Sequence, residues 1–191
     1  IHWRDWSSDV CSSDLPKLAD KHDLNVTVGT WIDNRLGRNQ TEIANAIRLA
    51  RENKNVVRVL IGNEVMLRND VPPEVLYEYL DRAREQIGQP VSTAEPWHVW
   101  VKNPELAKHV DFITVHLLPY WEGVEVDQAV DYSVQKMKLL QATFPGKPIV
   151  IGEVGGAHAH LAPHPPLGQR GTQSLLAHVL DERGERALAE L

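Results

Sequence analysis

Two glutamates that follow apolar runs are the residues of this sequence best suited to acid–base chemistry. Glu64 comes after the run at 56–62 and Asn63, and Glu153 lies in the run at 148–155. A carboxylate at the end of a buried run is costly unless it is paired or serves a function. Glycoside hydrolysis needs two carboxylates that face one bond, one to donate a proton and one to attack carbon or activate water. Since the two glutamates are far apart in the chain, only the fold can bring them together.

Aromatic and polar side chains follow the same apolar runs. An aromatic face gives a sugar ring an apolar platform, and the edge of a Trp or Tyr ring adds a polar group. Any one of these residues could instead pack or cap a strand end, and we expect packing for Trp100 in particular. The candidates for substrate binding are Trp31, Asn63, Glu95, Trp97, His116, Tyr120 and Trp121.

The elements that must position these residues alternate between strand and helix. Apolar runs rich in β-branched residues predict five strands, at 24–31, 56–62, 90–97, 111–115 and 148–155. Apolar residues at helical spacing predict helices at 41–53, 72–87, 103–109 and 130–141. Near-continuous apolar strands are typical of a parallel sheet covered by helices, so the chain is predicted to be an α/β protein.

The spacing alone does not distinguish an open parallel sheet from a closed barrel. No G-x-G-x-x-G motif follows any of the strands, which disfavours a dinucleotide-binding sheet. In (β/α)₈ barrels the active site is built at the carboxyl ends of the strands. The ionisable and aromatic residues follow the strands here, so we expect them to converge on one rim.

Composition and charge exclude several classes of function. The net charge of −6 and the pI near 5.8 argue against nucleic acid as a partner, because phosphates need clustered Lys and Arg. The single cysteine, Cys11, excludes an internal disulfide and the usual cysteine-based zinc sites. No apolar run reaches the ~20 residues that cross a bilayer. His158, His160 and His164 lie in a Pro-rich run that gives weak evidence of a metal site, so we assign no metal and no cofactor.

The two ends of the chain differ in character from residues 16–155, to which we assign the folded domain. Residues 1–15 have no helical or strand period, and DVCSSDL resembles the translation of a common sequencing adapter. We therefore interpret residues 1–15 as a non-native segment. Residues 156–191 contain no aromatic residue and are rich in Ala, His, Pro, Gly and Arg, so we interpret them as a doubtful tail read in a shifted frame.

Five motifs in this order resemble glycoside hydrolase family 17, and in particular its bacterial β-1,3-glucanases and glucanosyltransferases. Two of the motifs carry the glutamates, Gly-Asn-Glu-Val at 62–65 and Ile-Gly-Glu-Val-Gly at 151–155. The other three are Gly-Thr-Trp at 29–31, Ser-Thr-Ala-Glu-Pro-Trp at 92–97 and Val-His-Leu-Leu-Pro-Tyr-Trp-Glu-Gly at 115–123.

The resemblance implies a (β/α)₈ TIM barrel of which this chain holds about strands three to seven. It implies Glu64 as the acid/base and Glu153 as the nucleophile of a double displacement through a covalent glycosyl-enzyme. It also implies that Asn63 holds the sugar 2-hydroxyl, that Tyr120 lies near the nucleophile, and that His116 and Trp97 line subsites. This mechanism requires Glu64 to be protonated near neutral pH while Glu153 stays ionised.

By this resemblance the chain is a fragment of a retaining glycosidase or transglycosylase whose partner is a β-1,3-glucan oligo- or polysaccharide. Two alternatives stay open. One is an enzyme of the same clan that acts on β-1,4-glucan or mannan, and the other is a non-catalytic remnant that binds glycan. The sequence does not fix the location of the protein, and the family resemblance is compatible with a periplasmic, secreted or membrane-tethered parent.

Overall fold

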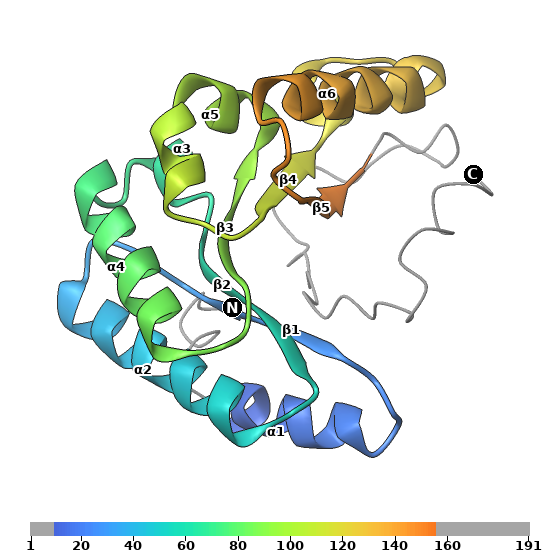
Figure 1. The fold of residues 1–191 in the computed structure, drawn as a ribbon. Helices are drawn as coiled ribbons and strands as arrows, with labels where there is room; N and C mark the ends of the chain where they lie inside the picture. The colour runs from blue at the N-terminus through green and yellow to red at the C-terminus, as the bar shows by residue number, and fades with distance from the viewer. Residues whose placement is uncertain (1–9, 156–191) are drawn as a thin grey trace, which may run out of the picture.

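The computed structural model describes residues 10–155 of the 191-residue chain, and five parallel strands form one sheet within them (Figure 1). Each strand pairs with the next one along the chain, in the order β1-β2-β3-β4-β5. All five overlap the apolar runs that predict them. They are β1 (Val26–Thr30), β2 (Val56–Asn63), β3 (Val91–Pro96), β4 (Ile113–Leu117) and β5 (Ile149–Val154).

Helices connect the strands and lie along one side of the sheet (Figure 1). The α-helices are α1 (Val10–Asp20), α2 (Leu36–Glu52), α3 (Val65–Arg68), α4 (Pro73–Gln86), α5 (Trp97–Lys102) and α6 (Ala129–Thr143). The three short 3₁₀ helices of the described residues are η1 (Pro104–Lys108), η2 (Pro119–Glu122) and η3 (Val126–Gln128).

The strand order decides between an open sheet and a barrel. A doubly wound sheet reverses its strand order at a switch point, whereas a (β/α)₈ barrel adds each strand beside the previous one. The consecutive order and the one-sided helices are those of a half-barrel. The prediction of an incomplete (β/α)₈ barrel is thereby confirmed, and the described residues supply five of the eight strands that closure requires.

Two segments differ from their sequence-based expectation. Helix α1 begins at Val10, so the last part of the segment that shows no helical period is helical. The helix expected at 103–109 is the 3₁₀ helix η1, and α5 precedes it. Pro104 starts η1 because proline fits the first turn of a helix but cannot continue the hydrogen-bond ladder of α5. The interpretation of residues 1–15 as non-native stays a prediction.

The hydrophobic core lies between the sheet and its helices. Alternate residues of β4 belong to this core, namely Ile113, Val115 and Leu117, so Thr114 and His116 lie on the opposite, inner face. Further core residues come from β2, α2, α4 and α5. They include Val59, Ile61, Ile43, Ile47, Leu76, Leu80 and Trp100.

The register between β4 and β5 contains an irregularity that reorients the end of β5. Val115 pairs with Ile151, but the next residue of β4, His116, pairs with Glu153, so Gly152 is passed over. Such a bulge inserts one residue into one strand and shifts the faces of the residues that follow. It places Glu153 opposite His116.

None of the helices in residues 10–155 combines the length and the apolar composition that crossing a bilayer requires.

The turn after β2 depends on the glycine that precedes the Asn-Glu pair. Gly62 has φ +88°, and a Cβ added there would lie 2.4 Å from Cγ2 of Val65. We expect Gly62→Ala to lower the free energy of unfolding by about 1–3 kcal/mol, because the side chain meets both an unfavourable φ and a packed neighbour. Denaturant unfolding of this chain measures the loss.

A glycine of helix α2 provides the matched control for Gly62→Ala. A Cβ at Gly37 meets nothing within 4 Å. Gly37→Ala should leave the unfolding free energy unchanged or raise it by up to about 1 kcal/mol, since alanine favours a helix. Equal losses from the two alanines would show that the turn does not require glycine at position 62.

Candidate active site

The carboxyl ends of β2, β4 and β5 bring Glu64, His116 and Glu153 together. Nδ1 of His116 lies 2.9 Å from Oε1 of Glu64, and Nε2 of His116 lies 3.9 Å from Oε1 of Glu153. The histidine ring is buried, whereas the side chains of Glu64 and Glu153 are 23% and 30% exposed. The two glutamates singled out in the sequence therefore contact opposite nitrogens of one imidazole, and both carboxylates reach solvent.

The position of His116 depends on the absence of a side chain at Gly152. A Cβ added to Gly152 would lie 3.1 Å from Cδ2 and 3.2 Å from Nε2 of His116, and 2.8 Å from Cγ2 of Thr114. The buried Nε2 of His116 has no hydrogen-bond partner among the described residues. The ring is thus held by packing against β5 on one side and by its bond to Glu64 on the other.

Glu64 adopts a backbone conformation that is rare for a residue with a side chain. Its φ of 55° and ψ of 32° lie in the left-handed region, and its N–H donates to the carbonyl of Ala94 at 2.7 Å. A non-glycine residue in this region costs about 1–3 kcal/mol and persists only where its surroundings fix it. This conformation ends β2 and turns the chain directly into α3.

Glu95 lies below this rim and not on it. Its side chain is fully buried, with Oε1 accepting the N–H of Met66 at 2.8 Å and Oε2 accepting the N–H of Leu67 at 3.2 Å. Glu95 pairs in register with Val115, a core residue that faces the helices. This placement differs from the substrate contact predicted for Glu95, because the period of two along β3 turns its carboxylate away from the inner face.

The carboxyl groups of Glu64 and Glu95 differ in their proton affinity. The hydrogen bond from His116 lowers the pKa of Glu64 and outweighs the effect of partial burial. Burial raises the pKa of Glu95 to about 7, against the two backbone hydrogen bonds that lower it. The unliganded site therefore favours ionised Glu64, whereas the acid role predicted for this residue requires the protonated form. Because an ionised carboxylate can only accept, Nδ1 of His116 is the donor.

Trp97 belongs to a cluster that the sequence reasoning missed. We call Trp97, Glu122, Tyr132 and Lys136 the Glu122 cluster. The carboxylate of Glu122 accepts from Nε1 of Trp97 at 2.9 and 3.0 Å and from the Tyr132 hydroxyl at 2.5 Å. Nζ of Lys136 lies 4.0 Å from the ring centroid of Trp97 and 4.5 Å from that of Tyr132. The cluster fixes the edge of Trp97 and places an ammonium group over one of its faces.

The Glu122 cluster ties three elements together. Trp97 begins α5, Glu122 ends η2, and Tyr132 and Lys136 lie on α6. Burial, and then the Glu122 carboxylate, raise the pKa of Tyr132 to about 12, so its hydroxyl stays a donor at physiological pH. The position of Glu122 directly after Tyr120 and Trp121 marks it as a residue near the rim, but it does not indicate the contact with Trp97.

The remaining aromatic candidates are accessible at the ends of the strands. Tyr120 and Trp121 are 55% and 78% exposed, and their rings form an edge-to-face pair with centroids 5.3 Å apart. Trp31 is 40% exposed, with the guanidinium of Arg68 4.3 Å from its ring centroid. These three residues have free area on which a sugar ring could stack.

Arg68 is a second residue of this region that the sequence reasoning did not select. Its guanidinium donates to the backbone carbonyl of Asn63, donates to that of Ile32 at 3.3 Å, and pairs with Asp70 at 2.6 Å. The contact at Asn63 involves its main chain, and the sugar contact predicted for its side chain stays a prediction. Trp100 is fully buried and donates to the carbonyl of Thr114 at 3.0 Å, as expected of a packing residue.

No group of three or more His, Cys, Asp or Glu side chains is arranged to hold a metal within residues 10–155. The three histidines at 158, 160 and 164 lie outside the described residues.

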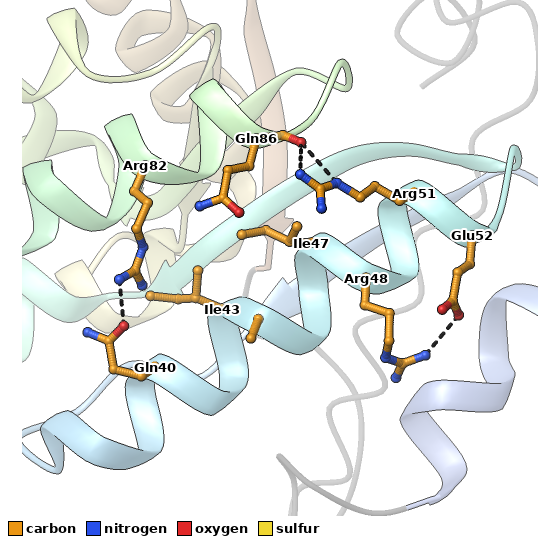
Figure 2. A pocket seen from close by; sticks show the side chains of 9 residues that line it. Gln40, Ile43, Ile47, Arg48, Arg51, Glu52, Arg82 and Gln86 are labelled. Carbon is orange, nitrogen blue, oxygen red and sulfur yellow. Dashed lines mark hydrogen bonds and ion pairs between the residues drawn. The ribbon is translucent and has the colours of Figure 1, made fainter.

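A groove of about 540 Å³ lies between α2 and α4, away from the strand ends (Figure 2). Its arginines are engaged by neighbours within the groove. Arg51 donates to the carbonyl of Gln86 at 2.7 and 3.1 Å, Arg82 to Gln40 at 2.5 Å, and Arg48 to Glu52 at 2.9 Å. The bonds of Arg51 and Arg82 cross between α2 and α4, so the groove is a seam between two packed helices.

Comparison with known proteins assigns the family. A family model described as the BtgE/BtgC glycoside hydrolase domain matches residues 4–162. The chain belongs to this family. The motif-based resemblance to glycoside hydrolases of family 17 is thereby confirmed, and the likeness to the bacterial branch stays a prediction.

Solved and curated relatives agree with membership in the BtgE/BtgC family. The family 17 β-1,3-glucanosyltransferase of Rhizomucor miehei is 28% identical, with a TM-score of 0.66 over 74% of this chain and 54% of that one. A glucan 1,3-β-glucosidase of Schizosaccharomyces pombe is 29% identical over 57% of this chain and 37% of its own length. A probable glucan endo-1,3-β-glucosidase of Aspergillus clavatus is 26% identical over 71% and 21%. The chain thus spans about a third or less of these two curated relatives.

The hydrogen bond from His116 should control the protonation of Glu64 in this BtgE/BtgC domain. We expect His116→Gln to raise the pKa of Glu64 toward its usual value of 4.5, because the donor at the Nδ1 position is lost. In the wild-type protein, the lowered pKa of Glu64 adds to the free energy of unfolding above pH 4.5, and this contribution is lost as the pH falls through the pKa of the folded state. The His116→Gln variant should therefore lose less stability on acidification. Carboxylate ¹³C titration by NMR and unfolding at several pH values measure both effects.

His109 offers a control with the same chemistry elsewhere in the domain. Its Nδ1 lies 2.8 Å from Oδ2 of Asp81 in α4, and His109 directly follows η1. His109→Gln should leave the Glu64 titration unchanged. A Glu64 pKa that is the same in wild type and His116→Gln would contradict the assignment.

Proposed function

We propose that this BtgE/BtgC domain forms the catalytic centre of a retaining glycosidase or transglycosylase that acts on β-1,3-glucan. The observation that carries the proposal is the contact of Glu64 and Glu153 with opposite nitrogens of His116 at the carboxyl ends of the strands. The names of the relatives support the substrate class. They include a glucan 1,3-β-glucosidase, and a glucanosyltransferase whose active-site mutant was crystallised with laminaritriose.

The proposed chemistry assigns the two glutamates to the two ends of one glycosidic bond. Glu153 attacks the anomeric carbon while Glu64 gives its proton to the leaving oxygen, and a covalent glycosyl-enzyme forms. Glu64, now a base, then takes a proton from water or from a sugar hydroxyl, which attacks the same carbon and releases Glu153. Water as acceptor gives hydrolysis, and a sugar gives transglycosylation.

The proton needed for the first step must be acquired when the substrate binds. The bond from His116 lowers the pKa of Glu64 in the unliganded site. A sugar that separates the Glu64 carboxylate from His116 removes this donor and excludes water, and both changes raise the pKa. Substrate binding thus converts Glu64 from an ionised group into an acid.

The exposed aromatic residues account for recognition of a neutral glycan. Tyr120 and Trp121 supply exposed apolar faces after β4, the strand that carries His116, and Trp31 supplies one after β1. Trp97 contributes only the face that Lys136 does not cover.

The decisive experiment uses the chain extended by the strands that close the barrel. We expect it to cleave or transfer β-1,3-glucan oligosaccharides such as laminaritriose, and not β-1,4-glucan or mannan oligosaccharides of the same length. Cleavage of the β-1,4-linked or mannan oligosaccharides would favour the alternative enzyme of the same clan. Binding of laminaritriose without turnover would favour the glycan-binding remnant.

Two substitutions in the extended chain separate the roles of the glutamates. Glu64→Gln should lower kcat by about 10²–10⁴-fold, the range expected for loss of a general acid. Glu153→Ala should abolish the covalent glycosyl-enzyme, which intact-mass spectrometry detects with an activated fluoro-sugar. Glu105→Gln, at an exposed glutamate of η1 paired with Lys108, is the matched control and should retain full activity. A covalent adduct that persists in Glu153→Ala would overturn the nucleophile assignment.

A further inference from the structure

We infer that Glu95 is a positioning residue whose buried carboxylate fixes the left-handed backbone at Glu64 and so directs the Glu64 side chain at His116. The inference deepens the proposed function, since it rests on the acid/base role of Glu64. The hydrogen bonds that the Glu95 carboxylate accepts come from the main chain of α3.

The backbone around Glu64 is held from both sides by consecutive residues of β3. The carbonyl of Ala94 accepts the N–H of Glu64 at 2.7 Å. The carboxylate of Glu95 then accepts the N–H groups of Met66 and Leu67 at 2.8 and 3.2 Å. Strand β3 therefore holds the N–H of Glu64 and, after the turn, the N–H groups of Met66 and Leu67. The backbone at Glu64 cannot rotate without breaking these hydrogen bonds to β3.

A carboxylate is the side chain that this arrangement requires. Helix α3 has only four residues, so its first N–H groups have no partner within the helix. So short a helix is not stable through its own hydrogen bonds. An ionised carboxylate accepts two N–H groups with its two oxygens, whereas an amide accepts with one oxygen and turns an NH₂ donor toward the second N–H.

The charges near Glu95 explain why its protonation is coupled to the rim. Glu64 raises the pKa of Glu95 and Arg68 lowers it, while burial is the largest effect and brings the pKa to about 7. Protonation converts one acceptor oxygen into a donor, so one of the two N–H bonds is lost. Because the pKa of Glu95 in the folded protein lies above its usual value of 4.5, Glu95 adds to the free energy of unfolding below pH 4.5. This contribution is lost as the pH rises through about 7.

The test compares Glu95→Gln with wild type in the 191-residue chain by NMR. The readouts are the Glu64 carboxylate titration and the Nδ1 proton signal of His116. Above pH 7, where Glu95 is ionised, we expect Glu95→Gln to weaken the Glu64–His116 bond, which shifts the Glu64 carboxylate signal and the histidine signal. Glu105→Gln should change neither. A Glu95→Gln protein that is less stable but keeps both signals unchanged would show a merely structural role and overturn the inference.

A measurement on wild type keeps the inference testable even where Glu95→Gln does not fold. The amide signals of Met66 and Leu67 should titrate with the same midpoint as the Glu95 carboxylate, near pH 7, and the Glu64 carboxylate signal should respond at that midpoint. Amide signals that do not follow the Glu95 carboxylate, or a Glu64 signal that does not respond, would overturn the inference.

The kinetic consequence is tested in the extended chain. Glu95→Gln should lower kcat at least 10-fold and leave KM within about 2-fold, because the carboxylate it positions acts in the transition state. A kcat equal to that of wild type overturns the inference. An extended wild-type chain with no activity refutes the proposed function, and the NMR results then decide the positioning role by themselves.

Discussion

The hydrogen bond between Glu64 and His116 is the contact on which the geometry of the rim depends. It joins β2 to β4, two strands that are separated by β3 in the sheet. A side chain can cross a strand in this way only where that strand offers little bulk on the same face. In β3 the residues in register with Thr114 and His116 are Ala94 and Pro96. The smallness of the inner face of β3 is thus a condition for the contact between its neighbours.

The same strand separates two carboxyl groups into two environments. The two carboxyl groups are those of Glu64 and Glu95. Within β3, Ala94 lies on the inner face, whereas the next residue, Glu95, is buried toward α3. Glu95 is held in a dry site and keeps its proton up to about pH 7, whereas Glu64 meets solvent and an imidazole that favours its ionised form. Neighbouring acids whose environments push their pKa values apart are typical of sites that move protons.

The sequence was sufficient for the fold and for the two glutamates because both depend on local patterns. Apolar β-branched runs predict strands, and a residue that ends such a run in a barrel reaches the rim. The orientation of Glu95 could not be predicted because every residue of β3 is buried, so no polar alternation reveals which face is which. The partners of Trp97 come from η2 and α6, and no spacing within the sequence predicts that Glu122, Tyr132 and Lys136 meet it.

The bulge at Gly152 sets the direction of the Glu153 carboxylate by a count of one residue. With regular pairing, His116 would face Gly152, and Glu153 would point into the layer of helices, where an unpaired charge is unfavourable. Loss of the codon for Gly152 would remove the bulge and leave Glu153 in regular pairing with His116. One further residue between Gly152 and Glu153 would instead take the place opposite His116 and turn Glu153 toward the helices. In this architecture the orientation of that carboxylate is therefore far more sensitive to a one-residue insertion than the scaffold that displays it.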